Sequence, residues 1–173
     1  EIWSRLVGSE MCIRDRISGA KVIAIDTNEK RLKFAKDQIG VDYILKAGDS
    51  TIKQVIEITN GDLCDAVFDA SGNKYALESC PDYMSHGGRF VLVGLYKGEL
   101  TYMHPKVHAK EMTLICSRNA NIEDFEYVIS VINQFPTESF ITHNVSLTEM
   151  IEDFDSWLDT ESGVMKATVN FNS

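Results

Sequence analysis

The sequence predicts an α/β protein in which a parallel β-sheet is covered by helices on both faces. Short apolar runs alternate with helical patterns at a regular pitch between residues 19 and 116. The runs at residues 21–25 and 89–93 are mostly apolar rather than alternating, as in strands buried on both faces. Strands separated by helices pair in parallel, because each crossover returns the chain to the same end of the sheet. The chain has 173 residues, enough for one such domain and a smaller piece.

Five strands are expected in this part of the chain, at residues 21–25, 42–45, 65–69, 89–93 and 112–116. Helices are expected between them, at about residues 28–38, 51–59 and 73–85. Asn28 should cap the first helix and Gly40 should end it, because Asn accepts from free helix N–H groups and Gly tolerates left-handed backbone. The His-Gly-Gly sequence at residues 86–88 should turn the chain into the most apolar strand.

The last third of the chain has a different pattern. A helix is expected at residues 121–134, where Asn121 and Asp124 resemble a capping pair. Its apolar stripe consists of Phe125, Val128, Ile129 and Ile132. Residues 140–145 should be extended, and Ser146 with Glu149 should form a capping box that opens a second helix. The side chains expected inward on that helix are Met150, Ile151, Phe154, Trp157 and Leu158. Residues 164–171 alternate like a closing strand.

Composition excludes several classes of function. The net charge of -9 and the lack of a basic patch argue against a nucleic-acid partner. The longest apolar runs are far too short to cross a bilayer, and the first residues do not follow a signal-peptide pattern. The four cysteines stand singly, which is typical of reduced thiols in a cytoplasmic protein. We therefore expect a cytoplasmic protein with small-molecule partners.

Asp26 is the most informative single residue, because it stands where an apolar strand ends. In a doubly wound sheet, a carboxylate at that position accepts hydrogen bonds from the ribose hydroxyls of adenosine and disfavours a 2′-phosphate. It therefore favours NAD over NADP. Arg31, one helical turn later, could contact the ribose or a phosphate oxygen. The alternative for Asp26 is a residue that only starts a turn. The alternative for Arg31 is a solvated cation on the surface of the helix.

Gly72 and Gly94 also follow strands, in the sequences Ala70-Ser-Gly72 and Val93-Gly94-Leu95. Ligands of doubly wound sheets bind at these carboxyl ends, where the strand order reverses. Because glycine has no Cβ, backbone could approach a flat cofactor ring closely at both positions. With Asp26 at a third strand end, the two glycines favour a dinucleotide site.

A set of segments in this order resembles the coenzyme domain of the medium-chain, zinc-type alcohol dehydrogenase family. The segments are residues 19–26, 31–36, 40–42, 65–72 and 87–94. The resemblance covers about residues 17–173. The family includes polyol, threonine and sugar-acid dehydrogenases. Residues 110–125 are similar to the galactonate and gulonate 5-dehydrogenase branch. The resemblance to the family implies a Rossmann-type doubly wound parallel sheet that is truncated at its N-terminal side. It also implies that a C-terminal segment of the chain returns to a missing catalytic domain.

The resemblance also implies residue roles. Asp26 and Arg31 would hold the adenosine ribose, while Thr27 and Ser71 would flank the adenine. Residues 93–95 would lie against the nicotinamide ribose and ring. The positions expected near the carboxamide are Cys116 and Ser117, and the position expected near the pyrophosphate is Lys166.

The family's glycine-rich turn is missing from this sequence. G-x-G-x-x-G should stand about 20 residues before Asp26, but only Gly8 and Gly19 precede it and neither belongs to such a motif. Residues 1–16 fit the family poorly and are expected to be a sequencing-adapter or assembly artefact, although residues 2–7 could fill the first strand's slot. We expect residues 17–117 to be a truncated NAD-binding domain and residues 118–173 to be C-terminal helices with a closing strand. This piece alone should be inactive and bind NAD weakly or not at all.

The resemblance implies that the intact parent is a zinc-dependent enzyme that oxidises a secondary alcohol and forms a homo-oligomer, a dimer or tetramer. The region after Leu95 would extend the sheet across subunits. The zinc ligands are expected in the missing half, and no metal site is expected here. His104 and His108 have a zinc-like spacing, but Pro105 favours a loop and no third ligand is evident. Two alternatives remain open: a non-catalytic nucleotide-binding module, and another Rossmann-fold enzyme such as a methyltransferase.

Overall fold

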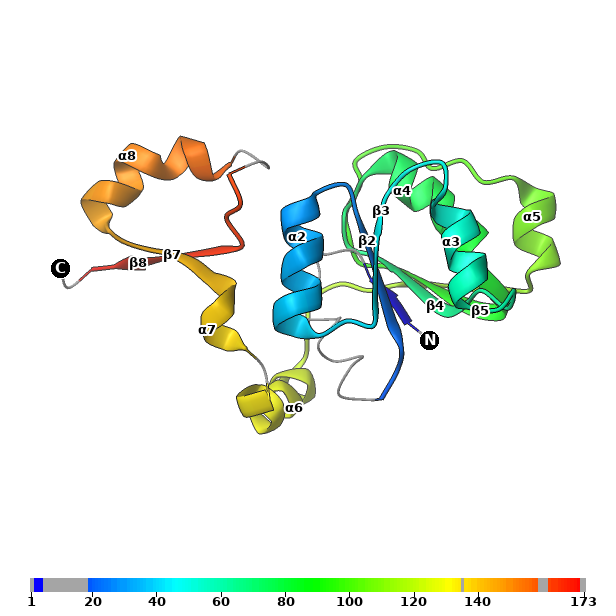
Figure 1. Cartoon of the computed structure of the whole chain (residues 1–173), viewed down its shortest axis with the longest axis horizontal. Coiled ribbons are helices and arrows are strands. Elements are labelled where there is room, and N and C mark those ends of the chain that lie inside the picture. Colours follow the sequence, from blue (N-terminus) through cyan, green and yellow to red (C-terminus); the bar gives the residue numbers. More distant parts are fainter. Residues whose placement is uncertain (1, 5–18, 135, 159–161, 172–173) are drawn as a thin grey trace. The chain divides into compact units, whose positions relative to one another are not determined.

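The computed structural model describes residues 2–4, 19–134, 136–158 and 162–171 (Figure 1). The chain forms two compact units, Glu1–Ala120 and Asn121–Ser173. The first unit contains the larger sheet and the second a pair of strands. Among the described residues, no helix has both the length and the apolar character that a membrane crossing requires.

The larger sheet confirms the predicted doubly wound architecture. Within the described residues it has six strands in the order β3-β2-β1-β4-β5-β6, and all neighbours pair in parallel. The strands are β1 (Ile2–Ser4), β2 (Val22–Asp26), β3 (Tyr43–Lys46), β4 (Cys64–Asp69), β5 (Met84–Leu92) and β6 (Thr113–Cys116). The order reverses beside β1, which therefore lies at the switch point where such sheets bind ligands.

Residues Ile2–Ser4 occupy the central slot that the sequence left open for residues 2–7. Ile2 pairs with Val22 on one side and with Ala66 on the other. The strands β2 and β4 are thus one strand apart, and their carboxyl ends share one edge of the sheet. This places Asp26 on the same edge as the loops that follow β4 and β5.

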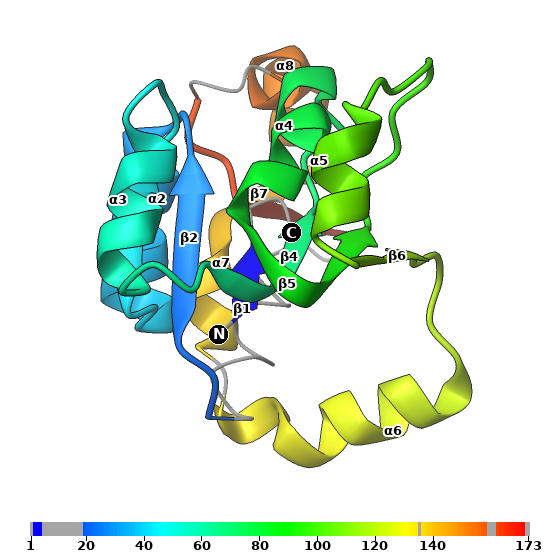
Figure 2. The same cartoon turned by 90° about the vertical axis from the view of Figure 1, so that its right-hand side faces the viewer.

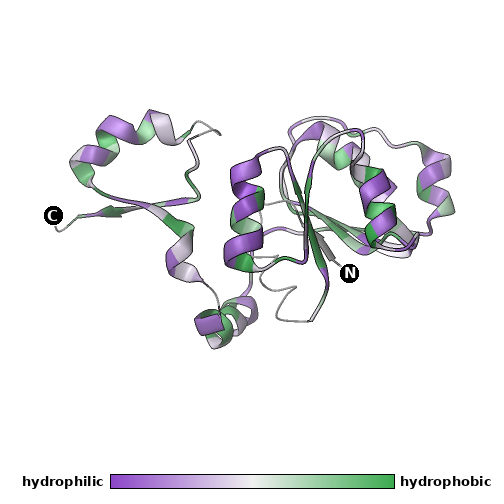
Figure 3. Cartoon of the chain, in the orientation of Figure 1, coloured by the Kyte–Doolittle hydropathy of each residue, from purple (hydrophilic) through white to green (hydrophobic). Residues whose placement is uncertain are grey.

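Each face of the sheet has its own core, which follows from the two-residue period of β2. Ile23 and Ile25 face one core, with helix α3 (Thr51–Ile58), helix α4 (Lys74–Ser79) and the 3-10 turn Cys80–Tyr83. Val22 and Ala24 face the other, with α2 (Glu29–Phe34) and the π-helical turn Ala35–Ile39. Figure 3 shows β2 and β4 in the apolar colour and the helices with mixed colours.

The predicted helix signals in this unit are confirmed at its first helix. The Asn28 side chain accepts hydrogen bonds from the backbone N–H groups of Lys30 and Arg31. Gly40 ends the π-helical turn with a φ of 75°, a conformation that residues with a Cβ rarely adopt. Asn28 thus fixes where the helix begins after β2 and Asp26, and Gly40 fixes where the helical segment ends.

Two predictions about local structure in this unit are wrong. Residues 86–88 do not turn into a strand but already belong to β5, which begins at Met84 and carries a register shift opposite Cys64–Ala66. Residues predicted as a loop form helix α5 (His104–Ala109). Pro105 lies in its first turn, where a missing N–H costs nothing because that group has no partner inside the helix.

The second unit contains the parallel pair β7 (Ile141–Ser146) and β8 (Lys166–Asn170). Its helices are α6 (Ile122–Val131), which continues as a 3-10 turn to Gln134, α7 (Thr137–Phe140) and α8 (Leu147–Trp157). Both predicted capping boxes are present, Asn121 with Asp124 and Ser146 with Glu149. The starts of α6 and α8 therefore follow from four polar side chains.

The prediction that α8 turns its apolar stripe inward is wrong for three of its five residues. Ile151 and Leu158 are 70% and 68% exposed, and Phe154 is 48% exposed. Met150 and Trp157 are half-buried, and Trp157 contacts the rings of His143 and Phe154. Two short strands offer too narrow a face to bury the whole stripe. The α6 stripe is exposed as well, from Ile132 at 41% to Ile129 at 67%.

Candidate nucleotide-binding site

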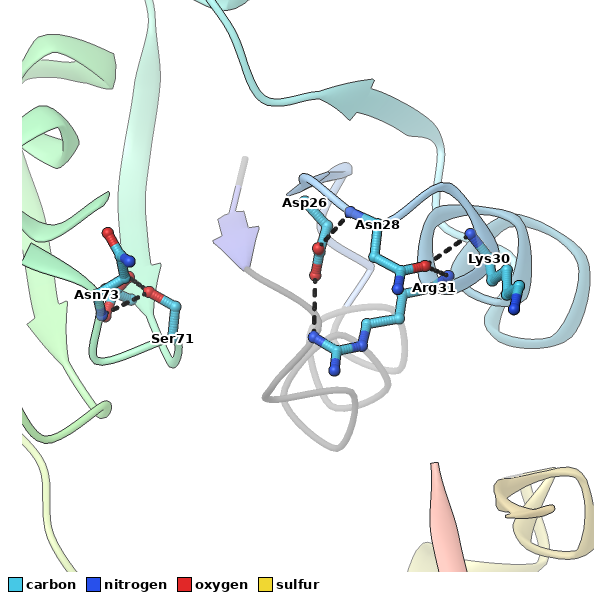
Figure 4. A network of polar contacts seen from close by, with 7 residues as sticks. Asp26, Asn28, Lys30, Arg31, Ser71 and Asn73 are labelled. Atoms are coloured by element: carbon cyan, nitrogen blue, oxygen red, sulfur yellow. Dashed lines mark hydrogen bonds and ion pairs between the residues drawn. The ribbon is translucent and has the colours of Figure 1, made fainter. Parts of the chain in front are cut away.

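The carboxylate of Asp26 is held where β2 ends and α2 begins. Its Oδ1 accepts a hydrogen bond from the backbone N–H of Asn28 at 2.8 Å, and Arg31 Nη1 lies 3.9 Å from its Oδ2. Figure 4 shows the carboxylate between these two groups. The Asp26 residue is 7% exposed. Oδ1 is thus engaged by the backbone, while among the described residues Oδ2 has only a long ion pair.

Arg31 is positioned by the helix rather than by the carboxylate. Its backbone N–H donates to the Asn28 side chain at 3.2 Å, and its own side chain is 26% exposed. At 3.9 Å the ion pair is too long for a hydrogen bond. The guanidinium can therefore turn toward a ligand without breaking a short contact.

Asp69, which the sequence analysis did not single out, organises the loop after β4. Its side chain is fully buried, and its carboxylate accepts from Ser71 Oγ at 2.6 Å and from the Gly72 N–H at 3.0 Å. Its backbone carbonyl accepts from the N–H groups of Val93 and Gly94, at 2.9 and 2.7 Å. One residue therefore ties together the loops after β4 and β5. The available sequence signal was a charged residue directly after the apolar run Ala66-Val-Phe68 and followed by Ala-Ser-Gly.

The structure explains why glycine is needed at positions 72 and 94, and the explanation differs from the one inferred from sequence. A Cβ on Gly72, whose φ is 60°, would lie 2.5 Å from the Leu95 carbonyl oxygen. A Cβ on Gly94 would lie 2.2 Å from the Gly72 nitrogen. Backbone atoms of the neighbouring loop fill the space that a Cβ at either position would need. The two glycines allow the loops to pack on each other; their contact with a cofactor stays a prediction.

The other predicted site residues follow the carboxyl ends of their strands. Thr27 follows β2 and is exposed, and Ser71 follows β4 and is half-buried, its Oγ also accepting from the Asn73 N–H (Figure 4). Val93 and Leu95 follow β5 and are exposed. The remaining pair at this edge is Cys116, the last residue of β6, and Ser117, whose N–H donates to the Leu92 carbonyl at 2.9 Å.

Lys166 belongs to the second unit, whereas the other predicted site residues belong to the first. It is the first residue of β8, in the second unit, and is exposed. Its backbone carbonyl accepts a hydrogen bond from Thr142 Oγ1 at 3.3 Å. Its role toward a pyrophosphate stays a prediction.

Over the part of the chain that the structure describes, no three or more His, Cys, Asp or Glu side chains gather as metal ligands would. Cys64 and Cys80 are buried cysteines and Cys116 is an exposed one; Cys12 lies outside the described residues. Cys80 Sγ contacts the carbonyl of Ala76, a residue of α4, at 3.2 Å. Of the described cysteines, Cys64 and Cys80 pack in the core and Cys116 ends β6.

The sheet order and the polar groups at its carboxyl edge define a class: doubly wound α/β proteins that carry a nucleotide-site geometry. Comparison with known families is more specific. The sequence model described as "Zinc-binding dehydrogenase" matches residues 8–134, which is most of the chain, and the protein belongs to that family. The match begins inside residues 1–16, and the artefactual origin of that segment stays a prediction.

Among curated relatives, the L-galactonate-5-dehydrogenase of Escherichia coli K12 is 28% identical over 158 residues, 90% of this chain and 46% of the relative. An NAD-dependent alcohol dehydrogenase of Sulfurisphaera tokodaii is 30% identical over 145 residues, 83% of this chain and 42% of the relative. The chain thus spans somewhat less than half the length of these relatives.

Solved structures agree on the fold. The 2R,3R-butanediol dehydrogenase of Bacillus subtilis superimposes with a TM-score of 0.88 at 19% identity, covering 99% of this chain and 51% of that one. At this identity the likeness establishes the fold alone. It includes the switch-point topology on which the candidate site depends.

Proposed function

We propose that this chain is the NAD-binding part of an oxidoreductase that transfers hydride from a secondary alcohol, a polyol or sugar acid, to NAD. The observation that carries the proposal is the buried Asp26 carboxylate, on the same sheet edge as the loops after β4 and β5. The printed names of two relatives, a sugar-acid dehydrogenase and an NAD-dependent alcohol dehydrogenase, support the reaction class.

The residues at Asp26 fit the adenosine end of a dinucleotide. Within the described part of the chain, Oδ2 has only the long contact to Arg31, and it can accept hydrogen bonds from ribose hydroxyls. A 2′-phosphate placed there would bring two anions together in a partly desolvated setting, which disfavours NADP. Arg31 can leave its ion pair to meet a phosphate or ribose oxygen. Thr27 and Ser71 would flank the adenine.

The other loops would hold the reactive end. NAD, when bound, supplies the acceptor for the hydride, and the chain supplies orientation. Residues 93–95 would support the nicotinamide ribose and ring, with Asp69 fixing the positions of two of their N–H groups. Cys116 and Ser117 would meet the carboxamide, and Lys166 the pyrophosphate.

The described residues do not form a zinc site of three or more protein ligands. We place the zinc of the proposed enzyme, with its alcohol site, outside residues 17–173, because the resemblance to zinc-type alcohol dehydrogenases implies zinc ligands in a separate catalytic domain. We also propose that the 173-residue chain by itself is inactive as a dehydrogenase, since it spans less than half the length of the curated relatives. The intact enzyme would act as a homo-oligomer.

The test of this site is a titration of Asp26→Asn against the unchanged protein, with NAD and NADP followed by NMR. Without G-x-G-x-x-G, NAD should bind no more tightly than the high micromolar to millimolar range, about -4 to -5 kcal/mol. Asn preserves an acceptor for the Asn28 N–H but removes the charge. NAD affinity should therefore fall by roughly tenfold, and the preference over NADP should disappear.

Asp62→Asn, at an exposed turn position, is the matched control and should change neither affinity. Equal binding of NAD and NADP by the unchanged protein would refute the assigned role of Asp26. Preferential binding of S-adenosylmethionine at the same edge would instead favour a methyltransferase.

A further inference from the structure

Helix α5 brings His104 and His108 onto one face, because residues four apart lie one above the other on a helix. The centroids of their imidazole rings are 5.6 Å apart and the rings are tilted by 40°. Both residues are exposed. The sequence pattern alone had placed these residues in a loop, where their spacing would have carried no geometric meaning.

From this geometry we infer a surface site for a divalent transition-metal ion, such as Cu²⁺, Ni²⁺ or Zn²⁺, chelated by His104 and His108. It is independent of the proposed dehydrogenase function and of the zinc assigned elsewhere. Two histidines at positions i and i+4 of a helix bind one metal ion in known metal sites. Imidazole is a ligand that suits all three ions.

The ring separation agrees with a shared ion. A metal–nitrogen distance of about 2 Å places the ion roughly 3 Å from each ring centroid. Two rings on one ion are then at most roughly 6 Å apart, and the observed 5.6 Å falls within that limit. Exposed side chains can change rotamer, which lets one nitrogen of each ring aim at a common point.

The helix is anchored by groups that leave the imidazoles available. Lys106 Nζ pairs with Asp82 Oδ1 at 3.0 Å, which ties α5 to the 3-10 turn Cys80–Tyr83. The N–H groups of Lys106 and Val107 donate to the Met103 carbonyl. Figures 1 and 2 show α5 as a short separate helix in the sheet unit. Holding the ligands on a fixed helix lowers the entropy cost of binding.

The chain contributes two ligands, because none of the described residues completes a group of three. Water or a small anion would fill the remaining positions. Such a site should follow the order of affinity of nitrogen ligands, with Cu²⁺ bound more tightly than Ni²⁺ or Zn²⁺. It would be a binding site for an exchangeable ion rather than a closed structural centre.

The experiment is a Cu²⁺ titration of the untagged full chain by calorimetry, with electron paramagnetic resonance to count nitrogen ligands. The structure predicts one ion and two equivalent imidazole nitrogens. His104→Ala and His108→Ala should each weaken binding at least about tenfold, a loss that even outer-shell changes commonly cause. Controls are His86→Ala and His143→Ala, which should leave the affinity unchanged.

A spacing variant separates chelation from simple histidine content. His108→Ala combined with Ala109→His keeps the number of histidines but moves the second imidazole around the helix. It should lose affinity as the single variants do, while circular dichroism reports an unchanged fold. Equal Cu²⁺ affinity in the spacing variant, or a signal from one nitrogen only, would overturn the inference.

Discussion

At the scale of single residues, two buried side chains show how the sheet edge is built. Asp69 uses both carboxylate oxygens and its carbonyl to join the loops after β4 and β5. Tyr102 packs edge-on against Phe90, with ring centroids 6.4 Å apart, but its buried hydroxyl finds no hydrogen-bond partner among the described residues. The first residue is a candidate for function, and the second is a cost to stability.

Replacing Tyr102 by Phe should stabilise the protein. The change keeps the ring contact and removes a buried hydroxyl that lacks a partner, so we expect the free energy of unfolding to rise by up to about 1 kcal/mol. Urea denaturation measures this difference. Tyr75→Phe, at an 82% exposed position, is the control and should have no effect. A loss of stability in Tyr102→Phe would mean that the hydroxyl has a partner after all.

The same residue predicts a dependence on alkaline pH. Burial raises the pKa of Tyr102 from 10.0 to about 12. Between those values the unfolded chain releases the phenolic proton while the folded protein retains it, so the free energy of unfolding falls as the pH rises. The unfolding free energy of the unchanged protein should fall more steeply between pH 10 and 12 than that of Tyr102→Phe. Identical slopes would contradict the burial of this group.

At the scale of elements, the helix starts depend on capping side chains. Ser146 Oγ lies 3.4 Å from the Glu149 N–H and donates to the Glu149 carboxylate at 2.8 Å, while the Ser146 N–H donates to the same carboxylate at 2.8 Å. The hydrogen bonds that the carboxylate accepts from Ser146 lower the pKa of Glu149, and the bond from the backbone N–H has the larger effect. The start of α8 is therefore defined by one Ser–Glu pair.

Ser146→Ala should loosen the first turn of α8, because it removes the acceptor for a free helix N–H. We expect a cost of about 1 kcal/mol, visible as faster amide hydrogen exchange at residues 148–150. Ser156→Ala, which removes only a hydroxyl bonded to the Asp153 carbonyl within the same helix, should leave these rates unchanged. Equal protection in both variants would argue against the capping box.

Several elements could be predicted from sequence because the signal is local. The strand β2 and the helix after it follow from an apolar run, an Asn cap and a terminating Gly. Helix α5 was missed because Pro105 suggests a loop, although proline is tolerated in a first turn. The burial of the α8 stripe was misjudged because the pattern identifies an apolar face but not what covers it.

The site was predicted only in part, for a similar reason. Asp26 could be found because it directly follows a strand, and position along a strand is a local property. The packing of Gly72 against Gly94 joins residues 22 positions apart, and the role of Asp69 depends on that contact. Such pairings are set by strand order, which the sequence pattern does not specify.

At the scale of the whole molecule, the strand order places the predicted site residues of the first unit at one edge of the sheet. A shift of β2 to the far side of β3 would have removed Asp26 from the switch point, but it lies next to β1. The sheet also ends in an exposed edge strand, β6, on which Leu114 is 53% and Ile115 is 38% exposed. Edge strands of this kind can pair with further chain, as the proposed oligomer requires.

The most direct test of the central claim is an amide NMR map of the unchanged chain titrated with NAD up to about 10 mM, enough to detect millimolar binding. The account predicts shifts confined to Asp26, Thr27, Arg31, residues 71–72, 93–95 and 116–117, and Lys166, with weaker effects from NADP. Shifts centred on another part of the sheet, or none at these residues, would contradict the assignment of this edge as a dinucleotide site.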